Sequence, residues 1–302
     1  MKKILSMLVA LSVILGVCAC AAAEEKTYNV GILQLIQHPA LDLATKGFKE
    51  ALTEKLGDKV AFDEGNASGD SNNCAQIAGQ LVSRQVDLIM ANATPALLAA
   101  ANATTTIPVL GTSVTDYVDT FAGNIPANVS GTSDAVPFAE QAKMMISSLG
   151  LVAGDVVGVL YCTNESNSLI QYEAVKALFE AEGIVVNAYT FSETTELQAL
   201  TTAMAGEVKA VYIPSDNTVA ANDSIVGTIC TEKNVPVYTS YGGAVCYASL
   251  SIDYYQLGYE TGVMAASILL EGKAPADIDI MTLTPAVAYN EELCNQLGIK
   301  VS

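Results

Sequence analysis

Hydrophobic residues along the chain follow two patterns that alternate from residue 28 onwards. Short apolar runs rich in valine and isoleucine predict buried strands, and longer segments with apolar residues three or four positions apart predict amphipathic helices. Pro39 suits the first turn of the first such helix, 40–56. That helix carries its apolar residues on one face: Leu41, Ala44, Phe48, Ala51 and Leu52.

This rhythm runs twice along the chain and ends in a tail. The first run predicts strands 28–35, 60–62, 87–91 and 107–111 with helices 40–56, 70–84 and 95–103. The second predicts strands 156–161, 184–191, 210–213 and 235–239 with helices 138–149, 168–181, 193–205 and 217–232. The tail predicts strand 248–252, helix 254–270, strand 286–289 and helix 291–297.

The repeated strand–helix units predict an α/β fold of two doubly wound lobes with parallel sheets. If the tail returns to the first lobe and then to the second, the chain crosses between lobes three times and forms a three-strand hinge. No linker rich in glycine, serine or proline separates the halves. We expect an N-terminal lobe of residues 27–133 plus 253–281 and a C-terminal lobe of residues 134–252 plus 282–302.

The N-terminus has the layout of a secretory signal over residues 1–19. Lys2 and Lys3 precede an apolar run over residues 4–17, which is short for a membrane-spanning helix. An uncleaved N-terminal anchor is the alternative. Residues 17–20 (Val-Cys-Ala-Cys) resemble a bacterial lipobox with Cys20 as the lipidated residue. Two acyl chains on Cys20 would anchor the protein outside the cell membrane, with residues 20–26 as a tether.

The charge balance narrows the choice of partners. The 302 residues include 14 Lys and Arg against 32 Asp and Glu, a formal net charge of −18. Such a surface disfavours nucleic acid and anionic lipid. An anionic ligand would therefore be held mainly by backbone N–H groups and hydroxyls.

Cysteine and histidine are arranged unfavourably for a metal site. His38 is the only histidine, and no C-x-x-C pair occurs among the five cysteines after residue 20. We expect no metal and no cofactor. Cys230 could pair with Cys246, and simple buried thiols are an equal alternative.

Enzyme motifs are also missing from the chain. It has no G-x-G-x-x-G after the first strand, no phosphate-binding G-x-x-x-x-G-K-[ST] and no G-x-S-x-G. A catalytic triad would depend on His38 alone. We therefore expect a protein that is not an enzyme.

Polar residues cluster directly after the predicted strands, in segments 35–39, 92–95, 112–116, 162–168 and 214–218. Each cluster alone could be an ordinary helix cap. Together they fall at the strand ends, where a cleft between lobes would lie. Ser166, Asn167 and Ser168 at a helix start could hold a carboxylate, and Asp216 could hold an ammonium group. An amino acid carries both groups, but composition does not choose it over a sugar.

Several segments resemble one known family. They are residues 36–42, 128–134, 212–219 and 258–262, supported by 158–161, 164–168 and 252–255. In this order they resemble the ABC-transporter substrate-binding lipoproteins of the TrpX-like family, which is associated with aromatic amino acids. The resemblance spans nearly all of the chain after the signal.

The resemblance implies a type I periplasmic-binding-protein fold, a monomer that closes about its hinge, and delivery to an ABC permease and its ATPase. A sensory binding protein for another small polar solute, such as a sugar or short peptide, is the alternative. Asp216 and Asn217 would meet the amino group, and residues 166–168 the carboxylate. The other residues implied at the cleft are Gln34, His38, Asn92, Thr94, Thr112, Ser113 and Asn164.

One segment departs from the family pattern. After the strand at 235–239, family members often carry an acidic residue, whereas this chain has Tyr241 followed by Gly242 and Gly243. A tyrosine there could stack on an aromatic ligand or fill space left by a smaller one. Tyr241 is therefore the candidate that bears on side-chain preference.

Overall fold

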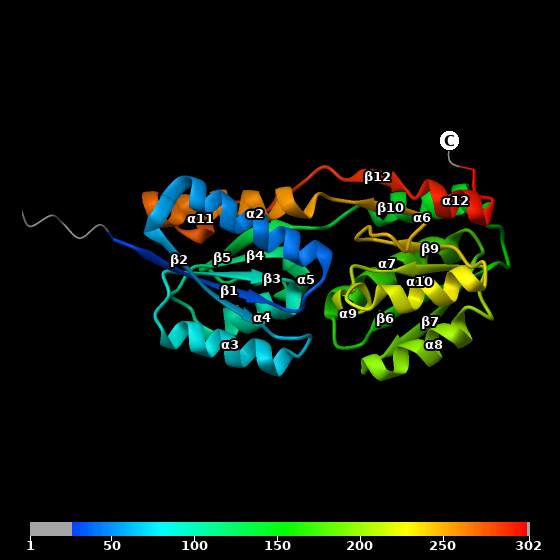
Figure 1. Ribbon diagram of the computed structural model, residues 1–302, viewed down its shortest axis with the longest axis horizontal. Helices are drawn as coiled ribbons and strands as arrows, with labels where there is room; N and C mark the ends of the chain where they lie inside the picture. The colour runs from blue at the N-terminus through cyan, green and yellow to red at the C-terminus, as the bar shows by residue number, and fades with distance from the viewer. Residues whose placement is uncertain (1–25, 301–302) are drawn as a thin grey trace, which may run out of the picture.

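The computed structural model describes residues 26–300, which form two α/β lobes side by side (Figure 1). The first sheet contains β1 (Tyr28–Gln34), β2 (Val60–Asn66), β3 (Leu88–Asn92), β4 (Val109–Val114), β5 (Val129–Ser133) and β11 (Met281–Thr282). The second contains β6 (Val156–Cys162), β7 (Val185–Phe191), β8 (Ala210–Ile213), β9 (Val237–Thr239), β10 (Ala248–Ser251) and β12 (Ala286–Tyr289). The expected fold class, two doubly wound lobes, is confirmed.

The two sheets have the same layout. The strand orders are β11-β5-β4-β3-β1-β2 and β12-β10-β9-β8-β6-β7, and every pairing is parallel except β10 with β12. Because parallel strands place their carboxyl ends at one edge, the loops after the strands of each lobe gather together. In Figure 1 the arrows of β1 and β3 point toward the second lobe.

Helices cover both faces of each sheet, as buried strands require. The first lobe has α2 (Pro39–Leu56) and α11 (Tyr254–Glu271) on one face, α3 (Ser71–Ser83) and α4 (Thr94–Ala103) on the other, and the short α5 (Tyr117–Thr120). The second has α6 (Phe138–Leu149), α7 (Ser166–Ala181) and α12 (Glu291–Leu297) on one face, and α8 (Leu197–Met204), α9 (Asn217–Ala220) and α10 (Asp223–Glu232) on the other. Three short 3₁₀ turns complete the elements: η1 (Gly57–Lys59), η2 (Thr194–Glu196) and η3 (Pro275–Asp277).

The chain passes between the lobes at residues 134–137, 252–253 and 283–285. A small apolar cluster fills the space where the crossings meet; it contains Ala40, Val136, Ile252, Tyr254 and Leu257. Tyr254 also donates a hydrogen bond to Asp134 Oδ2 at 2.9 Å, which ties two of the crossings together. The hinge therefore has an apolar core and a buried polar contact.

Close packing of α2 against α11 fixes the second crossing onto the first lobe. A Cβ atom on Gly258 would lie 1.9 Å from the carbonyl oxygen of Ala44, and one on Gly47 would lie 2.1 Å from that of Tyr255. Only glycine allows the two backbones to approach this closely. The apolar face predicted for α2 is buried throughout, which confirms that prediction.

Several predicted boundaries differ from the structure. Segment 217–232 is not one helix, because the chain turns at residues 221–222 between α9 and α10, where Asn222 leaves helical geometry. Segment 193–205 begins as the 3₁₀ turn η2 before α8. Strands β5 and β11 and helix α5 were not expected: β5 mixes serine and threonine among apolar residues, and the other two are short.

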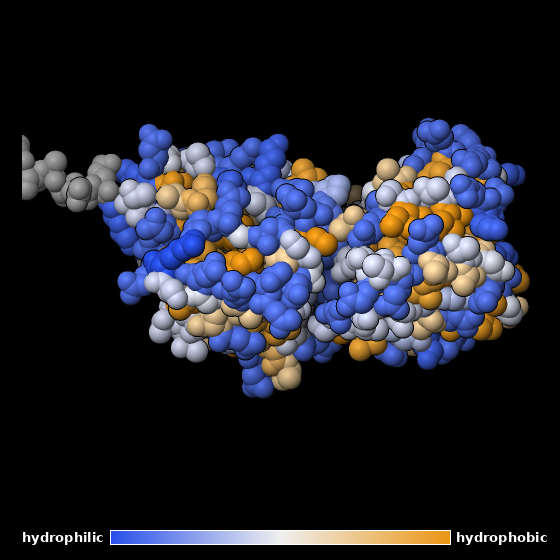
Figure 2. Space-filling view, turned by 60° about the horizontal axis from the view of Figure 1, so that its bottom comes forward, coloured by the Kyte–Doolittle hydropathy of each residue, from blue (hydrophilic) through white to orange (hydrophobic). Residues whose placement is uncertain are grey.

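The surface of the molecule is mainly hydrophilic in Figure 2, with hydrophobic residues gathered on parts of the second lobe, and the lobes meet along a narrow waist. Among the described residues, no helix has the length and apolar character that crossing a membrane requires. The signal segment, Cys20 and the tether up to residue 25 lie outside the described residues.

Candidate functional site

The layer between the lobes is built from the loops that follow the parallel strands. Most of the predicted site residues are buried there: Gln34, His38, Asn92, Thr94, Thr112, Ser113, Asn167, Ser168, Asp216 and Asn217. Tyr241 is partly buried, whereas Asn164 and Ser166 are exposed. Asn164 and Ser166 instead line grooves at the outer edge of this layer, between α7 and the first lobe.

Two residues at strand ends of the first lobe have strained backbones. Ala93 directly after β3 has φ 90°, and Ser113 near the end of β4 has φ 55°. Side chains disfavour this left-handed region, and such strain concentrates at functional sites. The Ser113 hydroxyl is buried and has no hydrogen-bond partner. Ser113 therefore keeps a buried hydroxyl available to a ligand.

Other predicted residues of the first lobe are engaged within that lobe. Gln34 donates to Asp42 Oδ1 at 2.7 Å and accepts from the Thr45 hydroxyl at 2.6 Å. Asn92 donates to the carbonyl of Leu41 at 2.8 Å, although its Oδ1 is buried without a partner. These contacts hold the loops to α2, so Gln34 supports the layer from behind.

Helices α4 and α7 start at the layer without a side-chain cap. The residues before α4 and α7 are Ala93 and Glu165, and neither side chain accepts a hydrogen bond from its helix. Free N–H groups at a helix start favour an anion. Near the start of α7, Asn167 donates to the carbonyl of Ser215 at 2.7 Å, and its Oδ1 is buried without a partner.

A pair of buried carboxylates organises the second-lobe side. Glu165 accepts four hydrogen bonds from the backbone and side chains of Asn217 and Thr218, at 2.6 to 3.0 Å. Asp216 accepts from the backbone N–H groups of Cys162 and Val219 and from the Ser168 hydroxyl, at 2.7 to 2.8 Å. These donors are all uncharged groups. Glu165 fixes the loop after β8 and was missed, although it lies in the predicted loop 162–168.

Burial and the neighbouring Glu165 hold the pKa of Asp216 well above the usual range of a carboxyl group. A positive charge placed beside this pair would relieve both effects. Asp216 Oδ1 accepts only the bond from Val219, which leaves it a further lone pair. The direct contact of Asp216 with an ammonium group stays a prediction.

Two hydrogen bonds join the lobes across the layer. His38 Nε2 lies 3.1 Å from Asn217 Oδ1, and Gln171 Nε2 lies 3.5 Å from the Thr115 hydroxyl. Since the amide nitrogen of Asn217 donates to Glu165, its oxygen faces His38, and His38 donates from Nε2. Burial lowers the pKa of His38, which favours the neutral ring.

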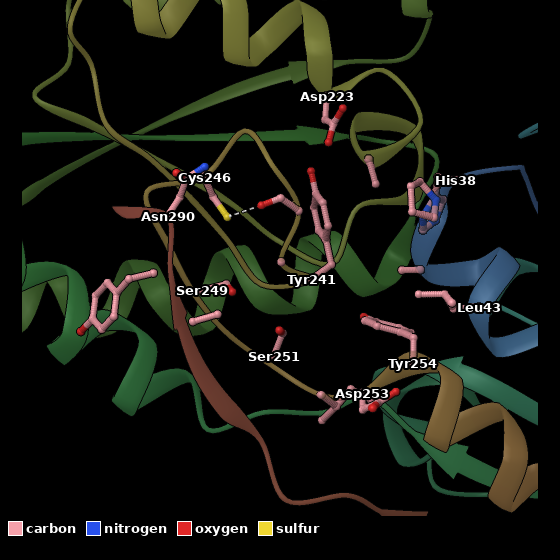
Figure 3. A pocket seen from close by; sticks show the side chains of 18 residues that line it. His38, Leu43, Asp223, Tyr241, Cys246, Ser249, Ser251, Asp253, Tyr254 and Asn290 are labelled. Atoms are coloured by element: carbon pink, nitrogen blue, oxygen red, sulfur yellow. Dashed lines mark hydrogen bonds between the residues drawn. The ribbon is translucent and has the colours of Figure 1, made fainter. Parts of the chain in front are cut away.

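A cavity of about 590 Å³ adjoins this layer, and we call it the hinge chamber (Figure 3). Its walls come from the start of α2, from α9 and α10, from the loop after β9, and from β10, β12 and the second crossing. The residues that line it include His38, Leu43, Asp223, Tyr241, Asp253 and Tyr254. Its volume falls in the range of pockets for small organic ligands, about 300–1,000 Å³.

Asp223 was not among the predicted site residues. The sequence placed it inside a continuous helix, but it is the first residue of α10 and faces the chamber. The triplet 222–224 (Asn-Asp-Ser) is typical of a helix start and could have signalled the break.

The described cysteines, Cys230 and Cys246 included, are free and buried. No group of three or more potential metal ligands occurs within residues 26–300.

Comparison with known proteins identifies a family and several relatives. A family model described as "ABC transporter substrate binding protein" matches residues 29–302. A Clostridioides difficile (strain R20291) protein described as "Tyrosine-binding protein" is 34% identical over 290 residues, covering 92% of this chain and 83% of the relative.

Two solved structures resemble the whole chain. An ABC domain from Streptococcus pneumonia in complex with L-Trp has 31% identity and a TM-score of 0.85, covering 92% of this chain and 96% of that one. The ligand-free, open structure of a substrate-binding protein with adhesive properties from Clostridium difficile has 33% identity and a TM-score of 0.67, covering 91% and 96%.

Proposed function

The chain belongs to the family of ABC transporter substrate-binding proteins, and on that basis we propose that it binds an aromatic L-amino acid between its lobes. The observation that carries this proposal is the buried polar layer, where Ser113 and Asn167 keep unpaired atoms beside two uncapped helix starts. The ligands in the names of two relatives, tyrosine and L-Trp, support the aromatic class.

The zwitterionic end of the ligand would lie in the layer. Its carboxylate would accept from the free N–H groups of α4 and α7 and from Ser113, because charge-assisted bonds to backbone groups need no lysine or arginine. Its ammonium group would lie beside Asp216, where its positive charge would favour the ionised form of this buried carboxyl group. Its side chain would enter the hinge chamber past His38 and Tyr241.

The lobes would close on the ligand by rotation about the three crossings. The two solved relatives have similar identities, yet the TM-score is 0.85 with the L-Trp complex and 0.67 with the open structure. A hinge rotation between two related proteins lowers the TM-score of the whole chain, although each lobe keeps its own structure. This difference supports a closed arrangement here. We place the lobes at residues 27–133 plus 253–281 and 134–252 plus 282–302.

A ligand that contacts both lobes only in the closed form stabilises that form. The closed protein, a monomer, would then dock on an ABC permease with its ATPase and release its cargo, without turnover of substrate. Lipidation of Cys20 would hold it at the outer surface of the membrane. Mass spectrometry of the mature N-terminus tests the lipid anchor. An unmodified Cys20 would contradict the proposed lipidation.

A calorimetric and thermal-shift panel of amino acids tests the ligand. We expect saturable binding of aromatic L-amino acids at one site per chain, with a melting temperature that rises with ligand concentration. Non-aromatic amino acids, glucose and galactose serve as controls. Binding of the sugars with no response to any aromatic amino acid would contradict the proposal, and consumption of a bound ligand would contradict the transport role.

A further inference from the structure

The far wall of the hinge chamber carries the Asp223 carboxylate and the Tyr241 hydroxyl. Figure 3 shows the Tyr241 ring across the chamber with its hydroxyl pointing toward Asp223. The Tyr241 hydroxyl is buried without a hydrogen-bond partner. Asp223 is partly exposed and lines the same chamber. None of the described residues that line it is a lysine or arginine.

The loop after β9 leaves space beside these two groups. A Cβ atom on Gly243 would lie 3.6 Å from Asp223 Oδ2 and 3.9 Å from Tyr241 Cε2, so both groups border the same small volume. Gly242 and Gly243 have φ of 83° and 109°, which other residues rarely adopt. The carbonyl of Gly242 accepts from Thr239 at 2.7 Å, which fixes the turn.

The rest of the chamber is suited to a flat apolar group. Pro39, Ala40, Leu43, Ala220 and Ile252 line it together with the rings of Tyr241 and Tyr254. An aromatic ring gains by leaving water for such a wall. At the far end, however, a carboxylate can only accept hydrogen bonds, so an apolar ring tip would desolvate it and leave it only the backbone N–H of Ser224 as a donor.

From this geometry we propose that Asp223, with the Tyr241 hydroxyl, selects ligands whose aromatic side chain carries a hydrogen-bond donor at its far end. The phenol O–H of tyrosine and the indole N–H of tryptophan have this chemistry, and phenylalanine lacks it. Asp223 is then a specificity-determining residue of the binding site. This inference rests on the proposed binding of aromatic amino acids.

The chamber supplies its own matched control. Asp253 also lines it, but its carboxylate caps α11 by accepting from the N–H of Gln256 at 2.9 Å. Asp223→Asn and Asp253→Asn therefore remove the same charge from the same cavity. They differ in position: Asp223 lies beside Gly243 and Tyr241, whereas Asp253 lies at the start of α11.

The experiment is calorimetric titration of L-Tyr, L-Trp and L-Phe into the wild-type protein, Asp223→Asn and Asp253→Asn. We expect the wild type to bind L-Tyr or L-Trp at least about tenfold more tightly than L-Phe, as a hydrogen bond to a charged group predicts. Whichever of L-Tyr and L-Trp binds more tightly shows whether the chamber prefers a phenol or an indole. Asp223→Asn should reduce that preference about tenfold, because a neutral acceptor is weaker. Asp253→Asn should retain it.

Tyr241→Phe keeps the ring and removes the hydroxyl, so it tests the same end of the chamber if Asp223→Asn fails to fold. It should also reduce the preference over L-Phe. Equal binding of all three ligands by the wild type overturns this inference and leaves the aromatic-binding proposal standing. Binding of none of them overturns both. A preference that survives both Asp223→Asn and Tyr241→Phe, or that is lost equally in Asp253→Asn, also overturns it.

Discussion

Replacing Ser113 with glycine should stabilise the ligand-free protein and weaken its ligand binding. Ser113 is held at φ 55°, and its buried hydroxyl has no partner. The left-handed region costs a non-glycine residue about 1–2 kcal/mol, of which the entropy of an unfolded glycine cancels about 0.5–1 kcal/mol. Removing an unpaired buried hydroxyl adds about 1–3 kcal/mol. We therefore expect Ser113→Gly to raise the free energy of unfolding by about 1–4.5 kcal/mol.

The assay is differential scanning calorimetry of the ligand-free protein, followed by titration of the ligand. At about 2–4 °C per kcal/mol, the melting temperature should rise by about 2–18 °C. Affinity should fall about tenfold, since the ligand loses a hydrogen bond in the closed layer. Stability and binding should thus change in opposite directions.

Two further variants separate the backbone from the hydroxyl. Gln85 has φ 54° in an exposed turn after α3, so Gln85→Gly should give only the backbone gain and leave affinity unchanged. Ser113→Ala keeps the strained Cβ and removes the hydroxyl, so it should weaken binding with a smaller gain in stability. Unchanged affinity in Ser113→Gly would show that Ser113 does not meet the ligand. A lower melting temperature would refute the strain argument.

Three other substitutions test the layer and the packing behind it. Asp216→Ala should abolish binding and lower the melting temperature, because the ammonium group of the ligand and the N–H of Val219 both lose their acceptor. Wild-type affinity of this variant in calorimetry would contradict that expectation. Burial lowers the pKa of His38 below its ordinary value of 6.5, so the closed form favours the neutral ring. Affinity should therefore be complete above about pH 6.5 and decrease as the pH falls below it, while His38→Gln should give a flatter profile in titrations from pH 5 to 8. Gly258→Ala should cost about 3 kcal/mol or more, since its Cβ would overlap Ala44, whereas Gly79→Ala on exposed α3 should gain up to about 1 kcal/mol in chemical denaturation.

The fold could be predicted correctly because the sequence patterns that indicate its strands and helices are local. Strands such as β3 are buried on both sides and therefore read as continuous apolar runs. The apolar face of α2 follows from its helical spacing. The break between α9 and α10 escaped notice because residues 217–232 keep enough apolar positions to continue one helix. For the same reason Asp223 was not predicted as a site residue. It lines the chamber because α10 begins at this residue.

Periodicity and chain order were enough to predict the two lobes and the polar loops at the strand ends, because both can be read along the chain. The three crossings depended in addition on where the tail returns, which the family resemblance supplied. Which polar side chains remain available to a ligand follows from the folded arrangement instead. Gln34 is engaged by Asp42 and Thr45, whereas Ser113 keeps an unpaired hydroxyl. The reason is that hydrogen-bond partners come from distant segments: His38 meets Asn217 across 179 positions of sequence, and the two residues belong to different lobes.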